Sequence, residues 1–216
     1  MASYRQSKHM NRIVSALLLL ASLLVACSRA DSDEPAKIVA PPNASVAIFS
    51  GGCFWCIQPP FDDAKGVVAT YVGYTGGDTQ NPSYEDVSGG QTGHRESIEV
   101  FYDPARITYQ QLLEIFWRNI NPTQTDGQFY DIGSQYTTAI YYANDQERRE
   151  ALGSRDALQK SGKFNAPIAT KIVPLGRFWP AEEHHQKYSH KNPDHYDAYH
   201  SGSGRDVYFK ETWGLK

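Results

Sequence analysis

Strand-like and helix-like segments alternate in a definite order between residues 45 and 175. Runs rich in β-branched and aromatic residues predict strands at Ser45–Ser50, Gly66–Tyr74, Arg95–Tyr102, Gln135–Tyr142 and Ile168–Leu175. Helical patterns lie between them at Cys53–Ala64, at Thr108–Ile120, and from the capping residue Asn144 to about Lys160. The order strand, helix, two strands, helix, strand, helix, strand predicts an α+β fold, a two-layer sandwich of helices on a mixed sheet.

The clearest predicted helix is Thr108–Ile120. Thr108 and Gln111 have the spacing of a capping box, and Leu112, Ile115 and Phe116 share one face. Residues 75–93 and 122–134 are predicted loops, and the length of the first favours a functional role. From Trp179 onward the chain is polar and rich in His and Tyr, so we expect a coil-rich C-terminus with one short helix at Ala181–Tyr188.

The first 26 residues have the pattern of a signal peptide. Arg5, Lys8 and Arg12 precede Ile13–Ala26, an apolar run of 14 residues that is too short to span a bilayer as an ordinary helix. The run ends in Leu24-Val25-Ala26-Cys27, which resembles the lipobox of bacterial lipoproteins. The resemblance implies that Cys27 is lipidated. An ordinary cleaved signal or an uncleaved anchor is the alternative, and Met10 is a possible second start.

The lipobox resemblance also bears on location. Residues 27–43 are polar and contain three prolines, which predicts a flexible tether before a domain over residues 44–216. A lipoprotein of this kind is extracytoplasmic and anchored to a membrane that faces the periplasm. Ser28 after the cysteine resembles lipoproteins sorted to the outer membrane rather than the inner one.

Composition excludes several classes of protein. The net charge of −3 gives no basic excess, so nucleic acid is not an expected partner. Three cysteines are too few for a disulfide scaffold. Five histidines lie between His184 and His200, but without the ligand spacing of known metal motifs, so no metal is expected.

Two of the cysteines form a Cys-x-x-Cys motif. Cys53 follows a predicted strand and Gly51-Gly52, where a helix N-terminus would lower the pKa of its thiol and favour the nucleophilic thiolate. Cys56 lies three residues further, so a Cys53–Cys56 disulfide is sterically possible. The motif alone is equally compatible with redox chemistry and with a structural disulfide.

The residues around this motif resemble the peptide methionine sulfoxide reductases of the A type. Gly52-Cys53-Phe54-Trp55-Cys56 matches their active-site motif, and further blocks match in the same order between residues 45 and 196. They are Gly73–Gly77, Asn81–Val87, Thr92–Glu96, Tyr102–Pro104, Asp131–Tyr136, Phe178–Glu182 and His185–Tyr188 with Asn192-Pro193. The resemblance implies a ferredoxin-like core within the mixed sheet.

The resemblance also implies the chemistry. Cys53 matches the nucleophile that attacks the sulfoxide sulfur, and Glu96 matches the acid that protonates the sulfoxide oxygen. Protonation near neutral pH needs a carboxyl with a raised pKa, so Glu96 should be buried. The expected activity is that of a peptide-methionine (S)-S-oxide reductase, acting on oxidised proteins and on free methionine sulfoxide.

Five further residues match the substrate site of the family. Phe54 and Trp55 match the apolar wall around the S-methyl group, for which sulfur–aromatic contacts give a physical reason. Tyr84 and Tyr136 match hydroxyl donors to the substrate oxygen. Asp131 matches a residue that positions solvent or the substrate backbone.

The recycling cysteine departs from the family pattern. Many relatives carry it soon after an Asn-Pro-x-x-Tyr segment, but Asp197 stands at that place here and no cysteine follows Cys56. If Cys27 is lipidated, Cys56 is the remaining thiol that can convert the Cys53 sulfenic acid to a disulfide. An external dithiol of the thioredoxin-like kind then restores the enzyme, which needs no cofactor and is expected to be a monomer.

Two other functions are alternatives to this one. A general thiol–disulfide oxidoreductase built on Cys53 and Cys56 would leave Glu96, Tyr84 and Tyr136 without a role. A non-enzymatic lipoprotein that binds an extracytoplasmic partner would not need Cys53.

Overall fold

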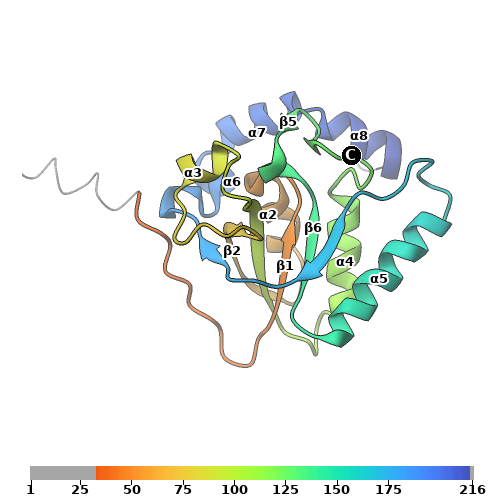
Figure 1. Cartoon of the computed structure of the whole chain (residues 1–216), viewed down its shortest axis with the longest axis horizontal. Helices are drawn as coiled ribbons and strands as arrows, with labels where there is room; N and C mark the ends of the chain where they lie inside the picture. The colour runs from red at the N-terminus through yellow and green to blue at the C-terminus, as the bar shows by residue number, and fades with distance from the viewer. Residues whose placement is uncertain (1–32, 215–216) are drawn as a thin grey trace, which may run out of the picture.

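The computed structural model describes residues 33–214 and is built around one six-stranded mixed sheet (Figure 1). Its strands are β1 (Ser45–Ser50), β2 (Val67–Thr75), β3 (Arg95–Tyr102), β6 (Ala139–Tyr142), β7 (Lys171–Pro174) and β8 (Trp179–Pro180). They lie in the order β7-β6-β1-β3-β2-β8, and only the β6–β7 pair is parallel. The predicted α+β fold with a mixed sheet is confirmed, and β1 and β3 have the predicted bounds.

The helices α2 (Phe54–Asp62), α4 (Tyr109–Arg118) and α5 (Asp145–Lys160) pack with the sheet around the main core. Phe49 of β1 stacks on Phe61 of α2 and on Phe116 of α4, with ring centroids 5.3 and 5.1 Å apart. Large aromatic rings bury much apolar area, so this stack holds the two layers together. The predicted capping box of Thr108 with Gln111 and the cap by Asn144 are both present.

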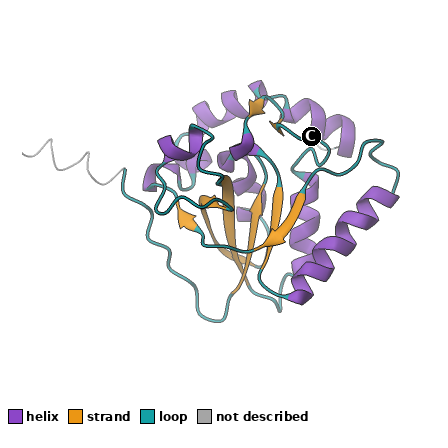
Figure 2. Ribbon diagram, viewed as in Figure 1, coloured by secondary structure: helices purple, strands orange, loops and turns teal. Residues whose placement is uncertain are grey.

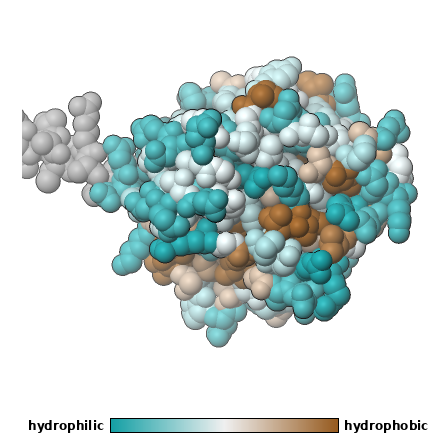
Figure 3. All heavy atoms as spheres, viewed as in Figure 1, coloured by the Kyte–Doolittle hydropathy of each residue, from teal (hydrophilic) through white to brown (hydrophobic). Residues whose placement is uncertain are grey.

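A segment of chain covers the opposite face of the sheet. Residues 175–178 connect β7 to β8 and cross in front of the strands (Figure 2). Leu175 and Phe178 pack there against Ile48 and Tyr141 in a second, smaller cluster. Figure 3 shows that this side of the molecule is mainly hydrophilic, with small hydrophobic patches between the polar residues.

The C-terminal part is helical, so the prediction of a coil-rich C-terminus was wrong. A 3-10 turn at Glu183–His185 replaces the expected helix Ala181–Tyr188, and α6 (Tyr188–Lys191), α7 (Pro193–Gly202) and α8 (Arg205–Trp213) follow. These helices are short, and few of their residues are buried. Their sequences therefore show no apolar stripe from which a helix could be predicted. Single side chains hold them against the domain instead.

The predicted loops also contain regular structure. Residues 75–93 include α3 (Tyr84–Ser88), which begins with a capping box between Ser83 and Asp86. Residues 122–134 include a hairpin of β4 (Gly127–Gln128) and β5 (Asp131–Ile132). Both elements are too short to give a periodic sequence pattern.

Part of the predicted tether packs on the domain. The amide of Ala36 donates to the carbonyl of Ala181 over 2.9 Å, and the amide of Glu183 donates to the carbonyl of Glu34 over 3.0 Å. The chain is therefore attached over residues 34–36, which differs from the flexible tether expected for residues 27–43. The predicted signal peptide and Cys27 lie outside the described residues. Within residues 33–214, no helix has the length and apolar character needed to cross a membrane.

Glu99 lies on β3 between Ile98 and Val100, which both belong to the main core. Because side chains alternate along a strand, Glu99 points to the other face of the sheet. Burial raises the pKa of its carboxyl to about 7. Its Oε2 atom is buried without a hydrogen-bond partner among residues 33–214. Ionised Glu99 is therefore a source of instability.

Replacing Glu99 by glutamine is expected to stabilise the fold at alkaline pH. The folded-state pKa lies above the unfolded value of about 4.3, so the stabilising contribution of the protonated carboxyl is lost as pH rises through about 7. Near pH 8, Glu99→Gln should raise Tm by about 2–4 °C, with a much smaller difference near pH 5. Thermal unfolding at both pH values measures this, and a Tm gain that does not depend on pH would contradict it.

Candidate active site

Cys53 sits at the junction of β1 and α2. It is the N-cap residue of α2, and its side chain is only 5% exposed. Gly52 before it has φ +86°, and a Cβ there would stand 2.6 Å from Cβ of Gln128. Only glycine fits this turn, which directs the Cys53 thiol into the domain.

Cys56 lies one helical turn after Cys53. Both residues are free thiols and buried, and their side chains are close enough to interact. Cβ atoms three residues apart on a helix are about 5–6 Å apart, whereas a disulfide needs about 3.5–4.5 Å. Cys53 has extended, non-helical backbone angles as the N-cap, so a local shift at this end of α2 can close the gap.

Burial raises the pKa of the Cys53 thiol well above its usual value. The expected lowering by the helix N-terminus was wrong, because desolvation and the neighbouring Cys56 thiol outweigh it. The positive charge of Arg205 acts in the opposite direction and favours the thiolate. In the resting site Cys53 is therefore a protonated thiol.

Glu96 lies on β3 beside the same helix end and is 2% exposed. Its Oε2 atom accepts a hydrogen bond from the amide of Phe54 over 2.9 Å. Burial raises the pKa of its carboxyl well above the usual range, and the proximity of Cys53 raises it further. The predicted rise of this pKa is confirmed, and the carboxyl can carry a proton near neutral pH.

Aromatic rings line the site next to Cys53. The ring of Phe54 lies 6.5 Å from that of Tyr84 and 5.1 Å from that of His185, measured between centroids. Trp55 stacks on Tyr188 of α6 at 3.9 Å. Phe54 and Trp55 thus form an apolar wall, as the sequence predicts, and the C-terminal helices complete it.

Tyr84 and Tyr136 approach Glu96 and Cys53 from α3 and from the 3-10 turn Ser134–Tyr136. Burial raises the pKa of Tyr84 to about 12, and the charges of Glu96 and Cys53 act in the same direction. Burial and the charge of Glu96 also raise the pKa of Tyr136. Both phenols therefore remain protonated and can donate hydrogen bonds at neutral pH.

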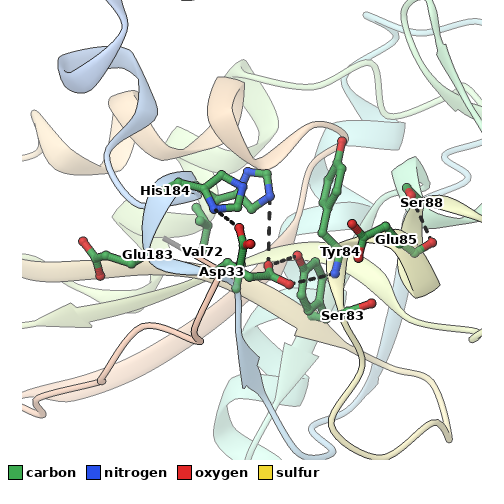
Figure 4. A network of polar contacts seen from close by, with 12 residues as sticks. Asp33, Val72, Ser83, Tyr84, Glu85, Ser88, Glu183 and His184 are labelled. Atoms are coloured by element: carbon green, nitrogen blue, oxygen red, sulfur yellow. Dashed lines mark hydrogen bonds and ion pairs between the residues drawn. The ribbon is translucent and has the colours of Figure 1, made fainter. Parts of the chain in front are cut away.

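A network of hydrogen bonds holds the backbone of Tyr84 in place (Figure 4). Glu182 accepts hydrogen bonds from the amide of Tyr84 and from the hydroxyl of Tyr74, each over 2.8 Å. His185 accepts from Nε1 of Trp55 over 3.2 Å, and burial lowers the pKa of its imidazole to about 3. A neutral His185 holds the wall residue Trp55 without adding charge. Glu182 and His185 lie in blocks that match the family, yet neither was predicted as a site residue.

Asp131 of β5 binds two residues of the C-terminal helices. Its Oδ1 atom accepts from the Tyr199 hydroxyl over 2.6 Å, and its Oδ2 atom accepts from Nη2 of Arg205 over 2.8 Å. The Tyr199 hydroxyl also lies near Cys53. Sequence reasoning missed Tyr199 and Arg205, because it treated this region as coil. Gly204 immediately before Arg205, with φ +86°, is the sequence signal of the turn that begins α8.

The structure brings together all of the predicted residues that it describes. Cys53, Glu96, Tyr84, Tyr136 and Asp131 interact electrostatically with one another, and Phe54 and Trp55 border them. Among residues 33–214, no group of three or more His, Cys, Asp or Glu side chains is placed to hold a metal ion. The site combines a buried thiol, a buried carboxyl with a raised pKa and two phenol donors beside an apolar wall.

Comparison with known proteins agrees with this arrangement. The sequence model of the peptide methionine sulfoxide reductase family matches residues 45–216. The chain is 48% identical over 171 residues to peptide methionine sulfoxide reductase MsrA of Bacillus licheniformis, covering 79% of this chain and 94% of that protein. It is 46% identical to the protein of the same name from Bacillus subtilis, covering 79% and 97%.

Two solved structures share the fold. Methionine sulfoxide reductase A of Corynebacterium diphtheriae is 35% identical with a TM-score of 0.63, covering 71% of this chain and 77% of that one. Mxr1 from Saccharomyces cerevisiae in reduced form is 31% identical with a TM-score of 0.68, covering 75% and 93%.

Proposed function

Because the chain belongs to the peptide methionine sulfoxide reductase family, we propose that Cys53 and Cys56 act in turn as its nucleophilic and its resolving thiol. The chain reduces methionine sulfoxide to methionine in a thiol-dependent reaction. The S epimer, in proteins and as the free amino acid, is the proposed substrate. The observation that carries the proposal is the buried carboxyl of Glu96, with its raised pKa, beside the free thiol of Cys53.

The first step transfers oxygen from substrate to enzyme. The Cys53 sulfur attacks the sulfoxide sulfur while Glu96 gives its proton to the sulfoxide oxygen, and the Cys53 thiol proton then restores the Glu96 carboxyl. The protonated oxygen then passes as a hydroxyl group from the substrate sulfur to the Cys53 sulfur, and the sulfoxide S–O bond and the transient bond between the two sulfurs both break. Methionine leaves reduced by two electrons, and Cys53 remains as a sulfenic acid. Hydrogen bonds from Tyr84 and Tyr136 stabilise the developing charge on the oxygen.

The second step restores the thiol. Cys56 attacks the Cys53 sulfenic acid and water leaves, which gives a Cys53–Cys56 disulfide. The proximity of the two buried, free thiols supports this pairing. An external dithiol of the thioredoxin-like class then reduces the disulfide by exchange. No resident cofactor enters this scheme.

The apolar wall gives the site its selectivity for a thioether group. The rings of Phe54 and Trp55 provide a surface for the S-methyl group, and sulfur–aromatic contacts favour that placement. Tyr84 and Glu96 then lie on the side of the polar oxygen. An asymmetric site of this kind distinguishes the two sulfoxide epimers, because only one places methyl and oxygen correctly together.

The proposed location is extracytoplasmic, with lipidated Cys27 anchoring a monomeric protein to the periplasmic face of a membrane, the outer membrane rather than the inner one. This rests on the apolar run Ile13–Ala26 and the lipobox-like Leu24–Cys27. Intact mass and peptide mapping of protein from a bacterial envelope test it. A mature chain that begins at Cys27 with a diacylglyceryl group is expected, and an unmodified Cys27 would contradict it.

An epimer-resolved assay tests the proposed activity. The purified full chain is given peptides that contain either the S or the R epimer of methionine sulfoxide, with dithiothreitol as reductant. Methionine is expected from the S peptide alone, and in a parallel assay insulin disulfides are expected to be reduced no faster than by dithiothreitol alone. Reduction of insulin without reduction of either epimer would return Cys53 and Cys56 to general disulfide exchange.

A further inference from the structure

The chain before β1 packs beside residues that hold the active site. Its N-terminal segment, residues 33–39, precedes the part of the chain that matches the family, and the proposed reaction makes no use of it. Ala36 is nevertheless only 5% exposed, and the amide of Val39 donates to the hydroxyl of Tyr71 over 3.2 Å. One buried residue in a mostly exposed segment shows that the segment is docked at a definite place.

The N-terminal segment adds a short strand-like layer at the edge of the sheet. Its backbone hydrogen bonds form an antiparallel bridge that pairs Pro35 with Glu182. The bridge covers residues 181–183, which directly follow the edge strand β8. On their other side, the amide of Ala181 donates to the carbonyl of Val72 in β2 over 2.9 Å. Residues 181–183 are therefore held between β2 and the N-terminal segment, as a strand is held between two neighbours.

Glu182 connects this bridge to the substrate side of the site. Its side chain is 8% exposed, and its Oε1 atom accepts from the amide of Tyr84 over 2.8 Å. Tyr84 begins α3, a helix of five residues in which only Val87 is buried. Because so short a helix has little stability of its own, we infer that the bond to Glu182 sets where the Tyr84 hydroxyl lies.

Side chains make a second connection between the same two regions. The carboxylate of Asp33 lies 3.9 Å from Nδ1 of His184, and Figure 4 shows this pair in the network around Tyr84. The ring of His184 lies 4.0 Å from that of His185, which lies 4.5 Å from the ring of Tyr84. Asp33 and His184 are both exposed, so their ion pair contributes little to stability. The backbone bridge therefore makes most of the connection.

We propose that the N-terminal segment is a positioning element of the active site, which holds Glu182 and thereby places the Tyr84 hydroxyl for the sulfoxide oxygen. The inference rests on the function proposed for this site. A segment that only covered the edge of the sheet would stabilise the fold and leave the reaction unchanged. Coupling to the site requires instead that detaching the segment loosens the Tyr84 amide and slows the reaction through Tyr84.

Ala36→Pro in the full chain tests the first requirement. Proline has no amide hydrogen to donate to the carbonyl of Ala181, so the bridge is lost. Amide hydrogen exchange reports the result without any reaction. The amides of Glu183 and Tyr84 are expected to exchange about tenfold faster or more. Ala40→Pro is the matched control, because Ala40 is exposed and lies outside the bridge, and it should change neither amide.

The amide of Phe54 serves as an internal reference. It donates to the carboxyl of Glu96 over 2.9 Å, in the same kind of bond that joins the amide of Tyr84 to Glu182. Its exchange in Ala36→Pro is expected to remain as in wild type. Equal acceleration at Phe54 and Tyr84 would mean that the segment supports the whole fold and not this site, which would overturn the inference.

The first turnover gives the second readout. With one equivalent of the S sulfoxide peptide, Ala36→Pro is expected to form methionine about tenfold more slowly, because Tyr84 is displaced but still present. Tyr84→Phe removes the hydroxyl and should slow the step by about 10²-fold or more. The two losses should not add, since the first acts through the second. A further tenfold loss from Ala36→Pro in Tyr84→Phe protein would contradict the inference.

The outcomes separate the inference from the function it rests on. A wild-type chain that forms no methionine from the S peptide would overturn the proposed function, while exchange at Tyr84 would still test the coupling. A Tyr84 amide that stays protected after the Glu183 amide has become exposed would overturn the inference, even if methionine forms normally. If Glu183 stays protected in Ala36→Pro, Ala36→Glu detaches the segment instead, because docking would bury a charge.

Discussion

Cys56→Ser protein is expected to form one equivalent of methionine and then to stop when a thioredoxin-like protein is the reductant. The Cys53 sulfenic acid still forms, but no second buried thiol in the described site can convert it to a disulfide. Steady-state turnover should therefore fall to the background rate, whereas the first turnover keeps nearly its wild-type rate. Methionine formed per enzyme is measured by quenched-flow chromatography, first without reductant and then with it.

Two further variants serve as the negative and the positive control for this experiment. Cys53→Ser should form no methionine at all, because the nucleophile is lost. Cys27→Ala should behave as wild type in detergent solution, because Cys27 is proposed to carry the lipid anchor and has no proposed part in the reaction. Dithiothreitol serves as a second reductant, since a small thiol can reduce a sulfenic acid directly. Wild-type turnover of Cys56→Ser with the thioredoxin-like protein would remove Cys56 from the cycle.

Glu96→Gln is expected to slow methionine formation in the first turnover by about 10²–10⁴-fold. Glutamine has nearly the same shape, and its amide oxygen can keep the 2.9 Å bond from the amide of Phe54. It cannot, however, transfer a proton to the sulfoxide oxygen. The rate of the wild-type first turnover should also fall as pH rises through the raised pKa of Glu96, because the acid form is then lost.

Glu99→Gln is the matched control for this change. Both glutamates lie on β3, but Glu99 belongs to the opposite face of the sheet and away from Cys53. Its replacement should leave the first turnover unchanged. Glu96→Gln should also unfold no more easily than wild type near neutral pH, since it removes a buried group that resists ionisation. A first-turnover rate within about threefold of wild type, far below the range expected for a lost general acid, would contradict the role of Glu96.

Local patterns were enough to predict most of the fold. Runs of β-branched and aromatic residues predicted the bounds of β1 and β3, and capping residues predicted the starts of α4 and α5. These signals depend only on residues that are close in sequence, so they can be recognised without knowing how the chain packs. The C-terminal helices have no such signal. They are stabilised by contacts far apart in sequence, such as that of Arg205 with Asp131.

The residues of the site also fall into those that the sequence predicts and those that it does not. Matched sequence blocks predicted Cys53, Glu96, Tyr84, Tyr136 and Asp131, and the structure places them together. Their electrostatics could be predicted only in part. The pKa of Cys53 is raised by burial, and burial depends on the whole fold rather than on the start of one helix. Arg205 and Tyr199 were missed because their role appears only when α7 and α8 reach the hairpin of β4 and β5.

Peptide mapping after one turnover tests the central claim directly. Full-length protein is mixed with one equivalent of the S sulfoxide peptide in the absence of reductant. Free thiols are blocked under acid, and the digested protein is analysed by mass spectrometry. The account predicts one equivalent of methionine and a disulfide that joins Cys53 to Cys56. Methionine formation with Cys56 still a free thiol, or with Cys53 joined to Cys27, would contradict it.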